Sequence, residues 1–134
     1  VYYYENTGNA TNPTFASSVA NPFNLVDIGG NSAPTFADFD GDGDLDLAMI
    51  AFFPENDKGK NESFLYFQNQ GKLQFQVSNL NLPDDARYMS MDAGDFDKDG
   101  DIDLLLGNFQ FGKPKPGVKL TPGLQIRLLR NTIR

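Results

Sequence analysis

Cysteine and histidine are both absent from this chain of 134 residues. Without cysteine there is no disulfide and no thiol nucleophile, and without histidine there is no imidazole for acid–base chemistry. An ordinary zinc site, which needs sulfur or nitrogen ligands, is excluded on the same ground. The missing cysteines do not identify a compartment. They mean that extra stability has to come from another source, such as a metal ion held by oxygen atoms.

Long apolar runs and basic stripes are missing as well. No apolar segment approaches the length of a membrane span, and the 11 lysines and arginines are scattered along the chain. Acids outside the two acidic loops described below, such as Asp84, Asp85 and Asp92, form no pair to which a catalytic geometry can be assigned. We therefore expect no membrane span, no nucleic-acid partner and no enzyme activity.

The negative charge of the chain is concentrated in two short segments. The formal net charge is −7, and ten of the 18 acidic residues lie within residues 38–46 and 95–103, accompanied by one base, Lys98. The remaining eight acids are outnumbered by ten bases. The acidity is thus local, and it gives no reason to expect an acidic tail or a nucleic-acid mimic.

These two segments have the same pattern, DFDGDGDLD and DFDKDGDID, and each aspartate lies 57 positions from its counterpart. Five carboxylates in nine residues repel one another at neutral pH, and a hard divalent cation is the usual remedy. Ca²⁺ takes six to eight oxygen ligands, and alternating aspartates with a glycine at the sharp turn can surround it. The repeated pattern predicts two bound Ca²⁺ ions, while a solvated acidic turn without metal is the alternative.

An EF-hand does not fit these loops. That motif requires an acid at its twelfth position and helices on both sides. The twelfth residues, counted from Asp38 and Asp95, are the apolar Met49 and Leu106. The short apolar runs that follow each loop are typical of buried strands. Each loop is therefore predicted to connect two strands of a hairpin.

Alternate side chains of such a loop can converge on one point. We predict carboxylate ligands at the first, third, fifth and ninth positions and a backbone carbonyl at the seventh. The predicted metal-site residues are Asp38, Asp40, Asp42, Asp44 and Asp46 in the first loop and Asp95, Asp97, Asp99, Asp101 and Asp103 in the second. Gly43 and Gly100 are expected to adopt a positive φ. Leu45 and Ile102 are expected to turn inward and anchor the loops.

The pattern Asp-x-Asp-x-Asp-Gly-x-x-Asp followed by an apolar strand resembles the FG-GAP/VCBS repeat. A second feature of that family is a strand ending in Asn-x-Gly and followed by a phenylalanine. Here it appears as residues 2–8 with Phe15 and as residues 65–71 with Phe75, and residues 126–132 form an incomplete third copy. The resemblance covers nearly the whole chain, and the aspartate loop is its specific part.

The resemblance implies an all-β fold made of β-propeller blades, each with four antiparallel strands, in which the calcium loop joins the first and second strands. It divides the chain into outer strands of a preceding blade at 1–32, a full blade at 33–86 and an incomplete blade at 87–134. Propellers have typically four to eight blades. About two blades cannot close a propeller, so further blades or other chains are expected to complete it.

For function, the resemblance implies structural Ca²⁺ in the strand-connecting loops and a role in adhesion or recognition. The partner would be a protein or carbohydrate at a cell surface, and the location would be extracellular, secreted or on the surface. Two alternatives stay open. The segment could be a non-catalytic or scaffold part of a secreted polysaccharide-degrading enzyme, or a structural subunit of a cell-envelope assembly.

Overall fold

The computed structural model describes residues 1–54, 62–80, 82, 87–109 and 125–132, and this part of the chain contains strands and loops but no helix. Its strands are β1 (Tyr2–Tyr3), β2 (Val19–Ala20), β3 (Gly30–Ala37), β4 (Asp46–Phe53), β5 (Phe64–Asn69), β6 (Phe75–Ser78), β7 (Tyr88–Gly94), β8 (Asp103–Asn108) and β9 (Ile126–Leu129). In the described residues, no helix is long and apolar enough to cross a membrane.

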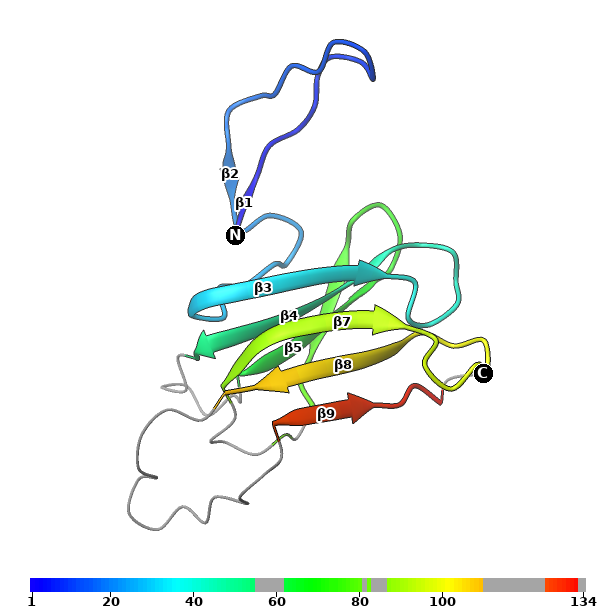
Figure 1. Ribbon diagram of the computed structural model, residues 1–134. Coiled ribbons are helices and arrows are strands. Elements are labelled where there is room, and N and C mark those ends of the chain that lie inside the picture. Colours follow the sequence, from blue (N-terminus) through cyan, green and yellow to red (C-terminus); the bar gives the residue numbers. More distant parts are fainter. Residues whose placement is uncertain (55–61, 81, 83–86, 110–124, 133–134) are drawn as a thin grey trace.

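The strands form three antiparallel sheets with the orders β1-β2, β3-β4-β5-β6 and β7-β8-β9. In each sheet every strand pairs with its neighbour in sequence, so the two larger sheets are simple meanders. Figure 1 shows these two sheets stacked on one another, with the β1–β2 hairpin extending away from them. The predicted fold class, all-β with a four-stranded antiparallel sheet, is confirmed.

Both aspartate loops connect the first two strands of a sheet. The β3–β4 ladder ends at the pair Ala37 and Asp46, and the β7–β8 ladder ends at the pair Gly94 and Asp103. The first loop therefore lies between β3 and β4, and the second between β7 and β8, at the same end of the two stacked sheets (Figure 1). The predicted hairpin connections are present, in place of the helices that an EF-hand would need.

The main core lies between the two larger sheets. Ala48 and Ile50 of β4 and Phe64 of β5 pack against Leu104 and Leu106 of β8. Side chains alternate along a strand, so the odd-numbered residues of β4 face the other way. They belong to a second buried cluster, which also includes residues of β5, of β6 and of the segment before β3. Its members are Ile28, Leu47, Met49, Ala51, Leu65, Phe67 and Phe75. Burial on both faces explains why β4 is almost continuously apolar.

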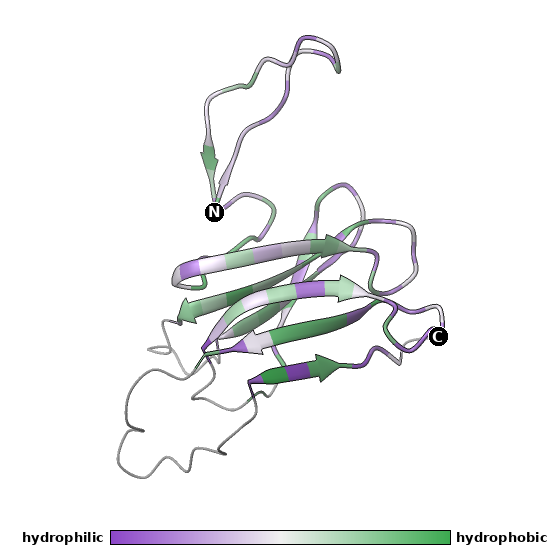
Figure 2. Cartoon of the chain, viewed as in Figure 1, coloured by the Kyte–Doolittle hydropathy of each residue, from purple (hydrophilic) through white to green (hydrophobic). Residues whose placement is uncertain are grey.

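The outer face of the second sheet has no such cover among the described residues. Ile126 and Leu128 of β9 are exposed, and Leu105, which pairs with Leu128, is half-buried. Figure 2 shows strongly hydrophobic colouring along most of β8 and on either side of a hydrophilic band in β9. An apolar sheet face of this kind is typical of a surface that another element covers.

The N-terminal hairpin repeats the local structure of the β5–β6 turn. In the hairpin, Oδ1 of Asn6 accepts hydrogen bonds from the N–H groups of Gly8 and Thr14, each at 3.0 Å. In the β5–β6 turn, Oδ1 of Asn69 accepts from the N–H of Gly71 at 3.1 Å. The shared Asn-x-Gly sequence thus produces the same side-chain-to-backbone turn in both places.

Candidate metal centre

The first loop gathers three carboxylates at one point. One oxygen from each of Asp38, Asp40 and Asp42 lies within 4.8 Å of the other two. Calcium–oxygen distances of 2.3–2.6 Å allow two ligands of one ion to be up to about 5 Å apart. The spacing and the hard oxygen donors therefore fit a divalent cation such as Ca²⁺.

Backbone N–H groups of the loop hold these carboxylates in place. The N–H of Gly43 donates to Oδ2 of Asp38 at 3.0 Å, and the N–H of Asp42 donates to Oδ1 of Asp40 at 3.2 Å. The N–H of Asp44 donates to Oδ1 of Asp42 at 2.8 Å. Gly43 has a φ of 93°, as predicted, and this conformation turns the chain around the carboxylates.

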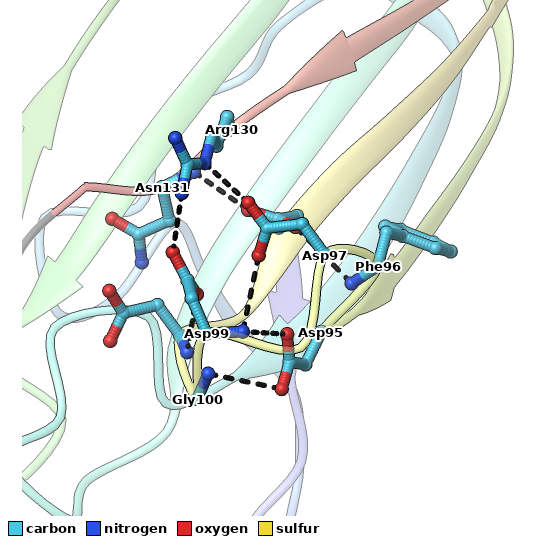
Figure 3. Close-up of polar contacts among 9 residues, drawn as sticks. Asp95, Phe96, Asp97, Asp99, Gly100, Arg130 and Asn131 are labelled. Carbon is cyan, nitrogen blue, oxygen red and sulfur yellow. Dashed lines mark hydrogen bonds and ion pairs between the residues drawn. The ribbon is translucent and has the colours of Figure 1, made fainter.

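The second loop repeats these contacts, as Figure 3 shows. The N–H of Gly100 donates to Oδ2 of Asp95 at 3.1 Å, and the N–H of Asp99 donates to Oδ1 of Asp97 at 3.3 Å. The N–H of Asp101 donates to Oδ1 of Asp99 at 3.1 Å. Oxygens of Asp95, Asp97 and Asp99 also lie within 4.8 Å of one another. The two loops thus offer the same set of donors in the same arrangement.

The ninth aspartate of each loop lies outside these groups of three. Asp46 is fully buried, and its Oδ2 accepts from the N–H of Phe39 at 3.2 Å and from the hydroxyl of Tyr66 at 2.7 Å. Its Oδ1 accepts from the N–H of Asn69 at 2.7 Å. A carboxylate has about four acceptor positions, so these three donors leave room for one further contact.

Asp103 is buried in the same way. Its Oδ2 accepts from the N–H of Phe96 at 3.2 Å, and its Oδ1 accepts from the N–H of Asn131 at 2.8 Å. Asp46 therefore fastens the first loop to β5, and Asp103 fastens the second loop to the segment that follows β9. Metal ligation by these two residues stays a prediction.

The predictions for the seventh and eighth positions of the loops have different outcomes. The side chains of Asp44 and Asp101 are not part of either group of three, and the predicted use of their backbone carbonyls stays a prediction. Ile102 contacts the core, but Leu45 is 59% exposed, so the predicted inward turn of Leu45 is wrong.

Three side chains of the two loops and their surroundings have shifted pKa values. The pKa of Asp99 is lowered, first by the hydrogen bond from the N–H of Asp101 and then by the guanidinium of Arg130. The pKa of Arg130 is raised by its hydrogen bonds to Asp99 and Asp97. Burial, followed by the hydrogen bond to Asp46, raises the pKa of Tyr66 and keeps its hydroxyl protonated as a donor.

Two side chains that contact the carboxylates were not predicted from the sequence. Gln68 donates from Nε2 to Oδ2 of Asp40, and Arg130 forms ion pairs with Asp97 and Asp99 (Figure 3). The available signal was their shared position, because each directly precedes one of the repeated asparagines. The asparagine motif predicts the strand ends and turns, but it gives no role to the residue before each asparagine.

Comparison with known proteins gives one match. Residues 51–106 match the family described as FG-GAP-like repeat. The matched segment runs from the end of β4 into β8 and contains the whole second loop. No curated protein and no solved structure shows significant similarity to the chain. The predicted resemblance to the FG-GAP repeat is confirmed for residues 51–106.

Proposed function

We propose that this chain is a calcium-binding β-propeller segment that serves adhesion or recognition outside the cell or at its surface. The observation that carries the proposal is the equivalence of the two aspartate loops. Both gather three carboxylates with matching backbone contacts, at the same end of two stacked sheets. One of the loops lies inside the FG-GAP-like repeat.

The proposed role of the metal is structural. The ligands would come from the carboxylates of Asp38, Asp40 and Asp42 in the first loop and from Asp95, Asp97 and Asp99 in the second. A bound Ca²⁺ would neutralise their repulsion and cross-link the first two strands of each sheet. Ca²⁺ should bind more tightly than Mg²⁺, which demands near-ideal octahedral geometry and gives up its water reluctantly.

The proposal also includes further blades. Ile126 and Leu128 are exposed on the outer face of the second sheet, whereas the inner face of the same sheet is buried against the first. A neighbouring blade would cover this face as the second sheet covers the first. The complete propeller would present a protein- or carbohydrate-binding surface, and its role would be binding and not catalysis.

Calorimetric titration tests the metal assignment. We expect two calcium ions per chain in the wild type and one in each of the variants Asp42→Ala and Asp99→Ala. Mg²⁺ should bind more weakly to all three proteins. Two ions per chain in either variant would show that the ligand assignment is wrong.

Thermal melting tests the structural role. At about 1 mM Ca²⁺ and a dissociation constant of about 10⁻⁴ M, each site adds roughly 1.4 kcal/mol to stability. The melting temperature with calcium should therefore exceed that with a chelator by several degrees. Identical melting curves would contradict a structural metal.

A ligand screen tests the recognition role. Glycan and protein arrays probed with the longest chain that carries this segment should give binding that calcium supports and a chelator weakens. Cleavage of a polysaccharide by the same chain would instead favour the alternative of an enzyme scaffold.

A further inference from the structure

The two loops differ in the side chain that reaches them from the third strand of each sheet. Nε2 of Gln68 in β5 donates to Oδ2 of Asp40 at 2.5 Å. Arg130, which follows β9, takes this place in the second loop, where its Nε forms an ion pair with Oδ2 of Asp97. Its Nη2 also lies 3.0 Å from Oδ2 of Asp99. The neutral amide at the first loop is thus replaced at the second loop by a guanidinium, which Figure 3 shows beside Asp97 and Asp99.

Gln68 and Arg130 occupy equivalent positions. Each precedes an asparagine, Asn69 or Asn131, whose N–H donates to the buried aspartate of its own loop, at 2.7 Å and 2.8 Å respectively. Three further backbone contacts of each loop also correspond, within a few tenths of an ångström. The chain therefore contains two copies of one site, and the second copy has two basic residues, Lys98 and Arg130, where the first has Gly41 and Gln68. Of these two bases, Arg130 forms ion pairs with the loop carboxylates.

The oxygens that Arg130 contacts are those that the backbone leaves open. Oδ1 of Asp97 and Oδ1 of Asp99 each accept a hydrogen bond from a loop N–H, whereas Arg130 takes the two Oδ2 atoms. An arriving cation would need these same Oδ2 atoms. Because the side chain of Arg130 is 56% exposed, the guanidinium can leave them by moving into solvent.

We propose that Arg130 is an internal cation that competes with calcium at the second loop, so that residues 95–103 bind the ion more weakly than residues 38–46. This inference rests on the calcium-binding function proposed above. One positive charge about 6 Å from a divalent ion in water weakens binding about tenfold. The first loop would then fill at low calcium, while the ion pairs of Arg130 hold the second loop together until calcium rises.

Single-site variants allow each loop to be measured alone. In an Asp42→Ala background, which retains the second site, adding Arg130→Gln should tighten calcium binding about tenfold by calorimetry. In an Asp99→Ala background, which retains the first site, adding Gln68→Arg should weaken binding about tenfold. Arg130→Lys in the first of these backgrounds keeps the charge and should keep most of the weakening. All three differences should shrink at high salt because the side chains are exposed.

A calcium titration of the wild-type chain, followed by NMR, tests the same inference without any variant. At protein concentrations well above both dissociation constants, a tenfold difference leaves about a quarter of the second loops filled at one equivalent of calcium, against about half for equal loops. The NMR signal of the Arg130 Nε–H should therefore make most of its shift over the second equivalent, as the ion displaces the guanidinium. If the wild type binds no calcium, both the proposed function and this inference fail. If the two loops bind with equal affinity and neither exchange changes it, only this inference fails.

Discussion

The first sheet, β3–β6, and the second sheet, β7–β9, contain the same repeat but bury different residues. Phe64 of β5 and Ile126 of β9 lie at equivalent positions, because Leu47 pairs with Phe67 and Leu104 pairs with Leu129 three residues further along. Phe64 is 2% exposed and Ile126 is 62% exposed. The burial of a position in such a stack is therefore set by the neighbouring sheet as much as by its own strand.

The same comparison extends to the buried aspartates. The hydroxyl of Tyr66 donates to Asp46, but the equivalent position in the second sheet is Leu128, which has no hydroxyl and is 52% exposed. Packing between the two sheets therefore partly buries Tyr66, whose hydroxyl also donates to the buried aspartate of the first loop. Within the described residues, the second sheet has neither this cover nor the additional donor.

Replacing the equivalent apolar residues should give the largest difference between the sheets. Phe64→Ala empties a buried position and should lower the free energy of unfolding by about 3–5 kcal/mol. Ile126→Ala removes an exposed side chain and should cost less than about 1 kcal/mol. Urea denaturation of both variants, with calcium removed by a chelator, measures the difference.

A large cost for Ile126→Ala would break this comparison. It would mean that the outer face of the second sheet is covered in solution, for instance by a second copy of the chain. Sedimentation of the same samples would then show an assembly heavier than the 14.8 kDa chain.

Much of this architecture follows from the sequence, because the central strands and their turns are specified by short segments of neighbouring residues. The apolar runs after each aspartate loop and the Asn-x-Gly turns predicted the central strands and the hairpins, and the structure confirms the all-β fold with a four-stranded antiparallel sheet. The burial of β4 on both faces, between two separate clusters, is a property of the packed sheets. The short N-terminal strands β1 and β2 likewise depend on pairing across a long hairpin, which local pattern does not determine.

Removing the hydroxyl of Tyr66 should give an intermediate effect. Tyr66→Phe deletes one of three donors to the buried carboxylate of Asp46 and keeps the aromatic ring. Loss of a hydrogen bond to a charged group should cost about 2 kcal/mol. Tyr2→Phe, which changes a tyrosine that is 71% exposed, is the matched control and should be neutral within about 0.5 kcal/mol. Equal urea midpoints for the two variants would show that Asp46 does not depend on this donor.

The convergence of the first, third and fifth aspartates was predictable, because alternation of aspartates in a turn brings them together whatever surrounds the loop, while their ligation of a metal stays a prediction. The inward turn expected of Leu45 is wrong, since its side chain is exposed. The contacts of Gln68 and Arg130 depend on strand pairing over about 30 residues, which the spacing within the loop does not reveal. The sequence therefore predicted the local part of the site and missed what the third strand adds.

The smallest expected effect concerns the glycines of the first loop. Gly41 has a φ of 76°, and its counterpart Lys98 adopts a φ of 63°, within the left-handed region that other residues can reach. Gly43 and Gly100 have φ values of 93° and 96°, further from that region. Because a Cβ added at Gly41 or Gly43 would meet no atom within 4 Å, a substitution there tests backbone strain alone.

Gly43→Ala should therefore cost about 1 kcal/mol of stability, whereas Gly41→Ala should cost about half as much. Both are measured by urea denaturation in the presence of a chelator, with Lys98→Gly as the reciprocal change in the second loop. Lys98→Gly should be neutral within about 0.5 kcal/mol, because relief of a positive φ offsets the greater freedom of glycine in the unfolded chain. If Gly41→Ala were as costly as Gly43→Ala, the two loops would not share one backbone path, since Lys98 shows that the second loop accepts a side chain at this position.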